Sequence, residues 1–332
     1  MYFNSSKMMM LMIMILSTIM IISLNSWMIS WMLMEINLFS FIPLMNNKNK
    51  LESESSMKYF FIQTICSMLL LLLIIILWNW MNLKNTIFLM MNLCLLMKMG
   101  SAPLHFWYIQ IIESMNWMIF FLLSSWQKIM PLIMLSYNFN NNLLMISIYL
   151  NSMFSMLGGI NMTSIRKILG YSSINHISWM MISMMTNNNL MNYYLMIYLF
   201  LMMNLSLMFF YFNMYKLNQL FNFNNLNKNM LMMMIIFFSL SGLPPFMGFI
   251  MKWMTINYMM MNNYFTMNLF MIMSSLIVLY FYLYFMYQSI MFNNFKMKWF
   301  IQFKNNKLML FTLNLTFISS FTLLMIMYMY MY

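Results

Sequence analysis

Long apolar runs with very few charges fill most of this 332-residue chain, of which 64% is hydrophobic and 6% charged. Soluble domains carry about 25% charged residues, so the composition excludes that class. In lipid the backbone must satisfy its own hydrogen bonds, which limits spanning segments to helices and closed barrels, and runs of about 20 apolar residues fit a helix. The sequence therefore predicts an all-α polytopic membrane protein.

We predict about eleven transmembrane helices joined by short, Asn-rich connections. No connection is long enough for an extramembrane domain, so residues 1–332 are expected to form a single transmembrane domain. The predicted spans are 8–24, 27–45, 57–78, 84–113, 117–137, 143–163, 166–186, 190–213, 230–261, 264–288 and 308–331.

Two of these spans are about 30 residues long and contain helix-breaking residues. The span 84–113 is interrupted by Gly100–Pro103, and the span 230–261 by Ser241–Pro245. Proline removes a backbone donor, and the carbonyls freed by a break are costly in lipid unless protein or water satisfies them. We therefore expect both breaks to face the protein interior.

Broken helices at corresponding places in two halves are typical of transporters built from internal repeats. We predict a first repeat at 1–138 and a second at 143–290, each with a broken fourth helix. An odd number of spans in each repeat makes the two halves inverted. Residues 291–332 would form a connecting segment and the last helix.

Residue usage indicates an organelle-encoded protein. Methionine occurs 57 times, whereas alanine, valine and arginine occur once each and aspartate is absent. The common residues have A/T-rich codons, and so much methionine favours a code in which ATA means methionine, as in animal mitochondria. We predict the mitochondrial inner membrane as the location.

The basic residues outside the spans define the sidedness. With eleven spans the two termini lie on opposite faces of the membrane. Among these basic residues, only Lys84 lies on the face opposite the N-terminus. The positive-inside rule therefore places the N-terminus in the matrix and the C-terminus in the intermembrane space. The membrane topology thus accounts for the net charge of +12, and no nucleic-acid partner is expected. A basic face of this kind is suited to bind phospholipid such as cardiolipin. The N-terminal face takes Lys7, Lys48, Lys50, Lys58, Arg166, Lys167, Lys216, Lys228, Lys296, Lys298, Lys304 and Lys307.

Four charged residues lie in the apolar interior of the predicted spans, away from the ends: Glu35, Lys98, Lys128 and Lys252. A charge at the centre of a bilayer costs roughly 2.5–3.5 kcal/mol even on lenient insertion scales, and such residues typically mark a proton or ion pathway. We predict that the three lysines and Glu35 form a proton relay.

The relay hypothesis assigns a role to each group. Burial disfavours the charged form of a lysine, whereas a nearby carboxylate favours it. Glu35, the carboxylate in the interior of the spans, would therefore control whether Lys98 carries a charge. Lys128 would then pass protons between Lys98 and Lys252. His176 is a further candidate because imidazole titrates near neutral pH, with a helix–helix hydrogen bond as the alternative.

Several other polar residues are expected to be structural. His105 would brace the first break, and Glu52 and Glu54 would be solvated in a loop. The two cysteines, Cys66 and Cys94, lie in apolar spans and are expected to act as small hydrophobes without a disulfide or metal.

No cofactor is expected on this chain. Two histidines are too few for the axial ligands of a haem-carrying redox subunit, and no cysteine quartet could hold an iron–sulfur cluster. No G-x-G-x-x-G fingerprint is present for a dinucleotide.

Six segments resemble the chain 2 family of NADH:ubiquinone oxidoreductase, respiratory complex I, in its mitochondrially encoded animal form. They occur in the order and at the spacing of the family and are WMLMEINLFSFIPLM (31–45), ESSMKYFFIQ (54–63), KMGSAPLHFWYIQ (98–110), SSWQKIMPL (124–132), GGINMTSIRKILGYSSINHISWM (158–180) and SGLPPFMGFIMKW (241–253).

The resemblance implies an antiporter-like subunit of the proton-pumping membrane arm, with other membrane-arm subunits as partners, neighbouring antiporter-like ones included. It also implies that NADH, FMN, iron–sulfur clusters and ubiquinone are bound by other subunits, and that quinone reduction there drives the relay. The essential glutamate and lysine row of the family match Glu35, Lys98, Lys128 and Lys252 here. A stand-alone cation/proton antiporter subunit of the same ancestral fold remains the alternative.

Overall fold

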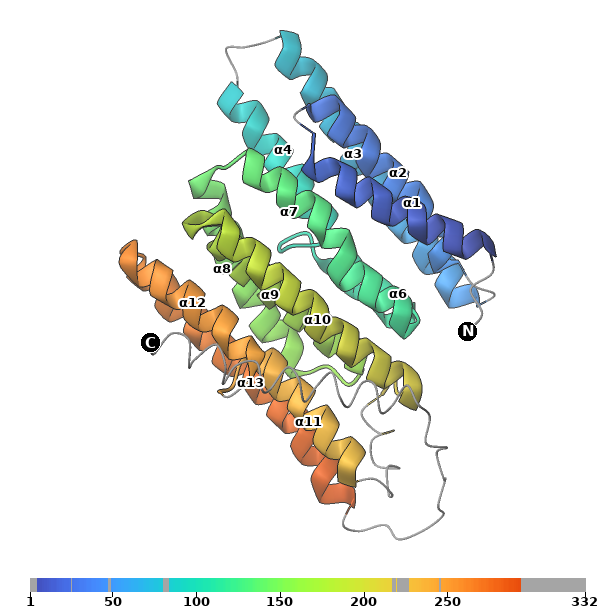
Figure 1. Cartoon of the computed structure of the whole chain (residues 1–332), viewed down its shortest axis with the longest axis vertical. Coiled ribbons are helices and arrows are strands. Elements are labelled where there is room, and N and C mark those ends of the chain that lie inside the picture. The colour runs from blue at the N-terminus through green and yellow to red at the C-terminus, as the bar shows by residue number, and fades with distance from the viewer. Residues whose placement is uncertain are drawn as a thin grey trace. The chain divides into compact units, whose positions relative to one another are not determined.

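The structure is a computed structural model that describes residues 5–24, 26–46, 49–79, 84–216, 219, 227–244 and 246–293. In these ranges the chain is helical apart from turns and one isolated β-bridge between Ser164 and Lys216 (Figure 1). The all-helical prediction is therefore confirmed for the described residues.

The chain divides into two compact units, Met1–Ser147 and Ile148–Tyr332, and α8 (Asn141–Ile160) runs across the boundary. In the first unit, α1 packs on α2, and α3 packs on both α2 and α4. Its helices are α1 (Ser5–Ile22), α2 (Trp27–Met45), α3 (Lys50–Asn79), α4 (Lys84–Met99), α5 (Phe106–Ser114), α6 (Trp117–Phe121), the π-helical turn η2 (Leu122–Trp126) and α7 (Gln127–Tyr137).

In the second unit, α9 packs against α10, and α12 contacts α9, α10, α11 and α13. This arrangement places α12, which carries Lys252, among four other helices. The helices are α9 (Ile165–Thr186), α10 (Asn188–Phe212), α11 (Asn227–Ser241), α12 (Met247–Met261) and α13 (Phe265–Asn293).

Both predicted helix interruptions are present. In the first unit α4 ends at Met99 and α5 begins at Phe106, with Gly100 at φ +70° in the connection. In the second unit α11 ends at Ser241 and α12 begins at Met247, with Gly242 at φ +79°. Glycine adopts this left-handed region at the lowest steric cost, so each glycine ends its helix where the sequence predicts the break.

One boundary was predicted wrongly, with a consequence for two carboxylates. Helix α3 begins at Lys50, seven residues before the predicted start of the span. Glu52 therefore lies on the buried face of a helix, with 2% of its surface exposed, and not in a solvated loop. Glu54 is exposed as expected and forms an ion pair of 2.7 Å with Lys58 one turn later.

Seven described helices are long and apolar enough to cross a membrane. They include α1, α2, α3, α8, α10 and α13, with the seventh formed by the continuous stretch Trp117–Tyr137. Each half of a broken helix is too short to be counted as a membrane span by itself. The predicted last span at 308–331 lies outside the described residues. So do five of the basic residues assigned to the N-terminal face, which are Lys48, Lys296, Lys298, Lys304 and Lys307.

The predicted span at 166–186 corresponds to α9, which is not among the seven. Its hydropathy is lowered by a run of polar residues that are buried inside the second unit, including Ser172, Ser173, Asn175 and His176. A helix that packs against protein on nearly all sides does not need a lipid-facing apolar surface. Hydropathy alone therefore fails to identify such a helix as a membrane span.

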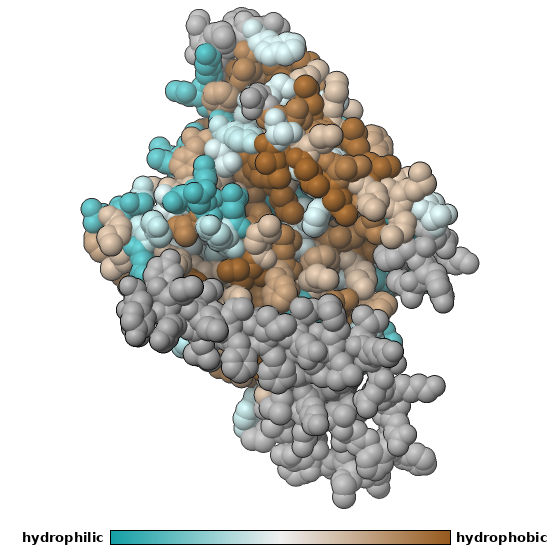
Figure 2. All heavy atoms as spheres, viewed as in Figure 1, coloured by the Kyte–Doolittle hydropathy of each residue, from teal (hydrophilic) through white to brown (hydrophobic). Residues whose placement is uncertain are grey.

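The outer surface of the first unit is suited to lipid. Figure 2 shows hydrophobic side chains over the face where α1 to α3 lie. Large apolar side chains are exposed there, among them Met12 and Leu16 of α1 and Phe61 and Leu72 of α3. Exposed apolar surface of this extent is typical of a membrane-embedded protein.

Candidate functional site: buried lysines in two polar interiors

The first unit buries two of the four predicted relay residues around one cavity. Lys98 lies in the last turn of α4 and is 8% exposed, and Lys128 lies in the first turn of α7 and is 2% exposed. Both line a cavity of about 30 Å³. A buried site needs about 10–15 Å³ for each water by this measure, so the cavity can accommodate about two water molecules.

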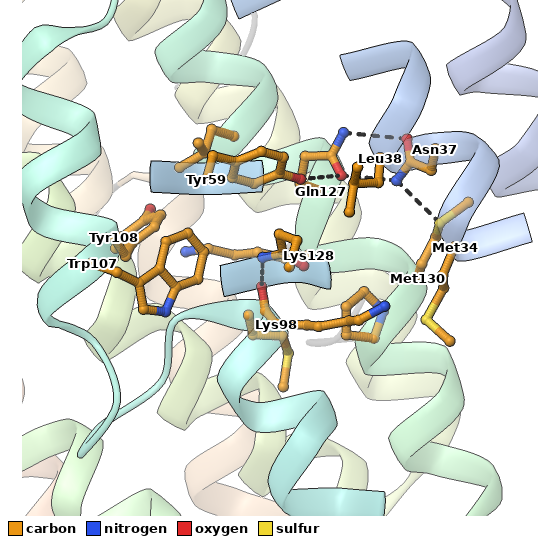
Figure 3. A pocket seen from close by; sticks show the side chains of 14 residues that line it. Met34, Asn37, Leu38, Tyr59, Lys98, Trp107, Tyr108, Gln127, Lys128 and Met130 are labelled. Atoms are coloured by element: carbon orange, nitrogen blue, oxygen red, sulfur yellow. Dashed lines mark hydrogen bonds between the residues drawn. The ribbon is translucent and has the colours of Figure 1, made fainter. Parts of the chain in front are cut away.

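The two lysine side chains extend in different directions (Figure 3). The Lys128 amine lies 4.9 Å from the centre of the Tyr108 ring, which is the geometry of a cation–π contact. Lys98 extends away from this ring, toward the side of the pocket where Met34 and Met130 lie. Direct contact between the two amines is therefore not part of this arrangement, and a proton passing between them needs the cavity.

Polar side chains from α2, α3 and α7 form one wall of the same cavity. Asn37 and Gln127 exchange two amide hydrogen bonds: Asn37 Nδ2 donates to Gln127 Oε1 over 2.8 Å, and Gln127 Nε2 donates to Asn37 Oδ1 over 3.2 Å. The hydroxyl of Tyr59 donates to Gln127 Oε1 over 3.5 Å, and Gln63 Nε2 donates to the carbonyl of Lys98 over 3.1 Å. These groups link the segments that carry both lysines to α2 and α3.

A π-helical turn precedes Lys128. Ser124 and Ser125 are buried in this turn, and both hydroxyls donate to the carbonyl of Phe121. Single π turns inside helices are frequent at functional sites, because the extra residue changes the direction in which the following side chains leave the helix. Here Gln127 and Lys128 follow the turn directly, and both line the cavity.

Glu35 is the acidic member of the predicted relay. It is half-buried on α2. No ion pair joins Glu35 to Lys98 in the part of the chain that the structure describes, and Glu35 Oε1 is buried without a hydrogen-bond partner there. An influence of Glu35 on Lys98 would therefore have to act without an ion pair between them.

The second unit buries Lys252, 6% exposed, where α11 and α12 meet at the helix break. Its amine donates to the carbonyl of Ser241, the last residue of α11, over 2.7 Å. The same amine lies 5.9 Å from the ring of Trp179 on α9. Lys252 is therefore held between a carbonyl and an aromatic face in a buried site.

His176 lies one turn before Trp179 on α9 and is 3% exposed. Its Nδ1 is 2.9 Å from the hydroxyl of Tyr194 on α10, and the Tyr198 ring lies 5.0 Å from the imidazole. The helix–helix hydrogen bond considered from the sequence is present. This contact holds the imidazole ring against α10.

His105 and the two cysteines were expected to be structural. His105 Nδ1 is 3.3 Å from the carbonyl of Pro103 and its ring stacks on Phe106, so it braces the first break. Cys66 and Cys94 are buried free thiols. Across the described ranges, no group of three or more His, Cys, Asp or Glu side chains is placed to hold a metal ion.

Sequence reasoning missed several residues of these two interiors. Asn37 and Gln63 could have been recognised in the sequence as interior residues, because an amide inside an apolar run needs a buried hydrogen-bond partner. Tyr59, Trp179 and Tyr194 could not, since aromatic residues make up 19% of the chain and their partners lie far along the sequence.

Comparison with known proteins identifies the family. The family described as NADH:quinone oxidoreductase/Mrp antiporter, TM, matches residues 24–278. NADH-ubiquinone oxidoreductase chain 2 of Anopheles gambiae is 43% identical over 326 residues, which cover 95% of each chain. Both findings cover the cavity residues and all four charged positions.

Solved structures agree at the level of the fold. A chain of respiratory complex I from Thermus thermophilus has a TM-score of 0.83 at 16% identity, covering 97% of this chain and 77% of its own. A chain of the Mrp complex from Dietzia has a TM-score of 0.70 at 13% identity, covering 78% of this chain and 56% of its own. The fold is thus shared with chains of complex I and of the Mrp complex, whereas the sequence identity is to chain 2. The protein is a multi-pass membrane protein with the antiporter-like fold and belongs to the NADH-ubiquinone oxidoreductase chain 2 family.

Proposed function

We propose that this chain translocates protons across the mitochondrial inner membrane as a membrane-arm subunit of NADH:ubiquinone oxidoreductase. The proposed relay consists of Glu35, Lys98, Lys128 and Lys252, with His176 as a further candidate. The observation that carries this assignment is the burial of three lysines inside helices, two of them on one polar cavity. Ionisable groups are costly inside a membrane, and burial of this kind marks a proton pathway.

A mechanism follows from the contacts in each unit. A change in the position or hydration of Glu35 would alter the charge that Lys98 experiences. Lys98 would exchange a proton with Lys128 through water in the cavity that both line. Lys252 would continue the relay in the second unit, where the Ser241 carbonyl accepts a hydrogen bond from its amine.

In this assignment the redox chemistry belongs to other subunits. NADH, FMN, iron–sulfur clusters and ubiquinone would be bound there, and quinone reduction would drive the relay through a change that reaches this chain. The partners would be other membrane-arm subunits, neighbouring antiporter-like subunits included, together with phospholipid such as cardiolipin at the basic face.

The proposed topology has eleven spans, arranged as two inverted five-helix repeats with broken fourth helices and a C-terminal helix. The N-terminus would lie in the matrix and the C-terminus in the intermembrane space. Lys58 lies near the start of α3, whereas Lys84 follows the end of that helix at Asn79. About 20 residues of helix span roughly 30 Å, so these lysines would face opposite sides of the membrane.

Labelling with a membrane-impermeant amine reagent tests this topology, because Lys58 and Lys84 are both exposed. We expect Lys84 to react in mitoplasts, which present the intermembrane-space side, and Lys58 to react in inverted inner-membrane vesicles. Mass spectrometry of the digested chain would read both sites. Detergent-opened membranes, in which both should react, provide the control, and reaction of both lysines from one side would contradict the proposed topology.

Replacement of Lys252 tests the function. In the assembled complex, we expect Lys252→Met to lower proton pumping and NADH:ubiquinone turnover by about tenfold or more, since a positioned proton-transfer group contributes about 10²–10⁴-fold. Lys84→Met is the matched control because Lys84 is exposed at the start of α4. Protons per electron would be measured in sealed vesicles. An unchanged ratio and turnover in fully assembled complex would exclude Lys252 from the relay.

A further inference from the structure

The end of α11 presents backbone carbonyls that the helix itself cannot satisfy. The last four carbonyls of any helix lack partners within it, and they carry a partial negative charge. At this end the Ser241 carbonyl accepts its hydrogen bond from the side chain of Lys252, eleven residues later on α12. A protonated amine is the favourable partner for such a helix end.

The lysine reaches this carbonyl by passing directly over Gly242. A Cβ atom on Gly242 would lie 2.9 Å from Cδ, 3.2 Å from Cε and 3.2 Å from Nζ of Lys252. Contacts this close require the lysine to move. A side chain at position 242 would therefore compete with the lysine for the space next to the carbonyl.

The left-handed backbone at position 242 does not by itself require glycine in this chain. Asn213 and Asn263 have φ values of 49° and 63°, so asparagine serves at other left-handed turns of the same unit. At Gly242 a second constraint is present, because the Lys252 side chain passes over the α-carbon. The need for glycine here comes from the contact with Lys252 as well as from the turn.

We propose that Gly242 is a positioning residue for Lys252: the absence of a side chain at the helix break lets the lysine amine reach the Ser241 carbonyl. This inference rests on the proposed function, in which Lys252 belongs to the proton relay. A side chain at position 242 would move the amine away from the α11 carbonyl and misalign it for proton transfer. Displacements of about 1 Å in a reacting group can cost about 10²-fold in rate.

Two substitutions separate the lysine contact from backbone strain. Gly242→Ala adds the Cβ and also strains the left-handed turn, whereas Gly242→Asn adds the Cβ with a residue that tolerates such turns. Asn263→Ala is the matched control for strain, because it places alanine at positive φ in an exposed turn. Lys252→Met in parallel reports whether the lysine itself matters.

The measurements are protons pumped per electron and NADH:ubiquinone turnover, both normalised to assembled complex on a native gel. We expect both Gly242 variants to lower coupled turnover by about tenfold, while Asn263→Ala lowers it less than about twofold, following the cost of misplacing a reacting group. Wild-type pumping in Gly242→Asn, alongside a defective Lys252→Met, would overturn the positioning role. Wild-type pumping in Lys252→Met would instead overturn the proposed function.

Failure of the Gly242 variants to assemble leads to a second comparison. If the new Cβ collides with the lysine, the double variant Gly242→Ala with Lys252→Ala should assemble again, because the truncated side chain leaves room. Two substitutions that share one contact are expected to be non-additive in this way. An equally unassembled double variant would overturn the inference.

Discussion

Replacement of Lys128 by methionine is expected to give the largest loss of proton pumping among the four proposed relay positions. Lys128 is 2% exposed and lines the cavity that it shares with Lys98. A positioned proton-transfer group contributes about 10²–10⁴-fold, so coupled turnover per assembled complex should fall by roughly a hundredfold. Methionine is flexible and apolar and fills irregular gaps, so the complex should still assemble. Pumping would be followed by a pH-sensitive dye in sealed vesicles.

Lys128→Arg sharpens this experiment. Arginine keeps a positive charge and does not release its proton in proteins. If Lys128 transfers protons, the arginine variant should pump as poorly as the methionine variant. A complex that pumps normally with arginine would show that Lys128 acts as a fixed charge beside Tyr108 and not as a carrier. Lys84→Met again controls for the loss of a lysine at an exposed site.

Gly248→Ala is expected to give the largest loss of stability. Gly248 lies in the first turn of α12, and a Cβ there would lie 1.6 Å from the backbone carbonyl oxygen of Ser239 on α11. A backbone atom cannot turn aside as a side chain can, so the two halves of the broken helix would have to separate. Ordinary overpacking costs about 1–3 kcal/mol, and we expect a cost above this range and little assembled complex on a native gel.

Gly159→Ala is the matched control for this effect. Gly159 lies in α8, and its added Cβ would meet the Phe281 ring at 2.7 Å, which is a side chain that can shift. Alanine also favours a helix over glycine by about 1 kcal/mol, which offsets part of the cost. We expect this variant to assemble at close to the wild-type level. Equal assembly of the two variants would contradict close packing at Gly248.

Much of the local structure could be predicted from the sequence because membranes impose simple rules. Apolar runs defined the helices within a few residues, and Gly100 and Gly242 placed both breaks correctly. The same rules failed at Glu52, since a polar segment can continue a helix when its buried face meets other protein. Hydropathy likewise fails to identify α9 as a membrane span, because its polar side chains are buried in the second unit.

The candidate site was predicted only as a set of charged positions. Lys98 and Lys128 stand out in sequence because a charge in an apolar run is rare, but their common cavity depends on how α2, α3, α5 and α7 pack. The amide pair of Asn37 and Gln127 joins residues 90 positions apart, and no local sequence pattern predicts such a pair. Glu35 is half-buried on α2 and forms no ion pair with Lys98 among the described residues.

The helical class, the two breaks and the four charged positions in the middle of apolar runs can be read from the sequence, because lipid leaves a chain of this composition few alternatives. What each of these charges faces depends on how the helices pack. Lys128 lies over Tyr108, and Lys252 meets the Ser241 carbonyl above Gly242. The physical reason is that hydrophobicity acts on each segment locally, whereas the environment of a buried amine is set by side chains and carbonyls from helices that are distant in the sequence.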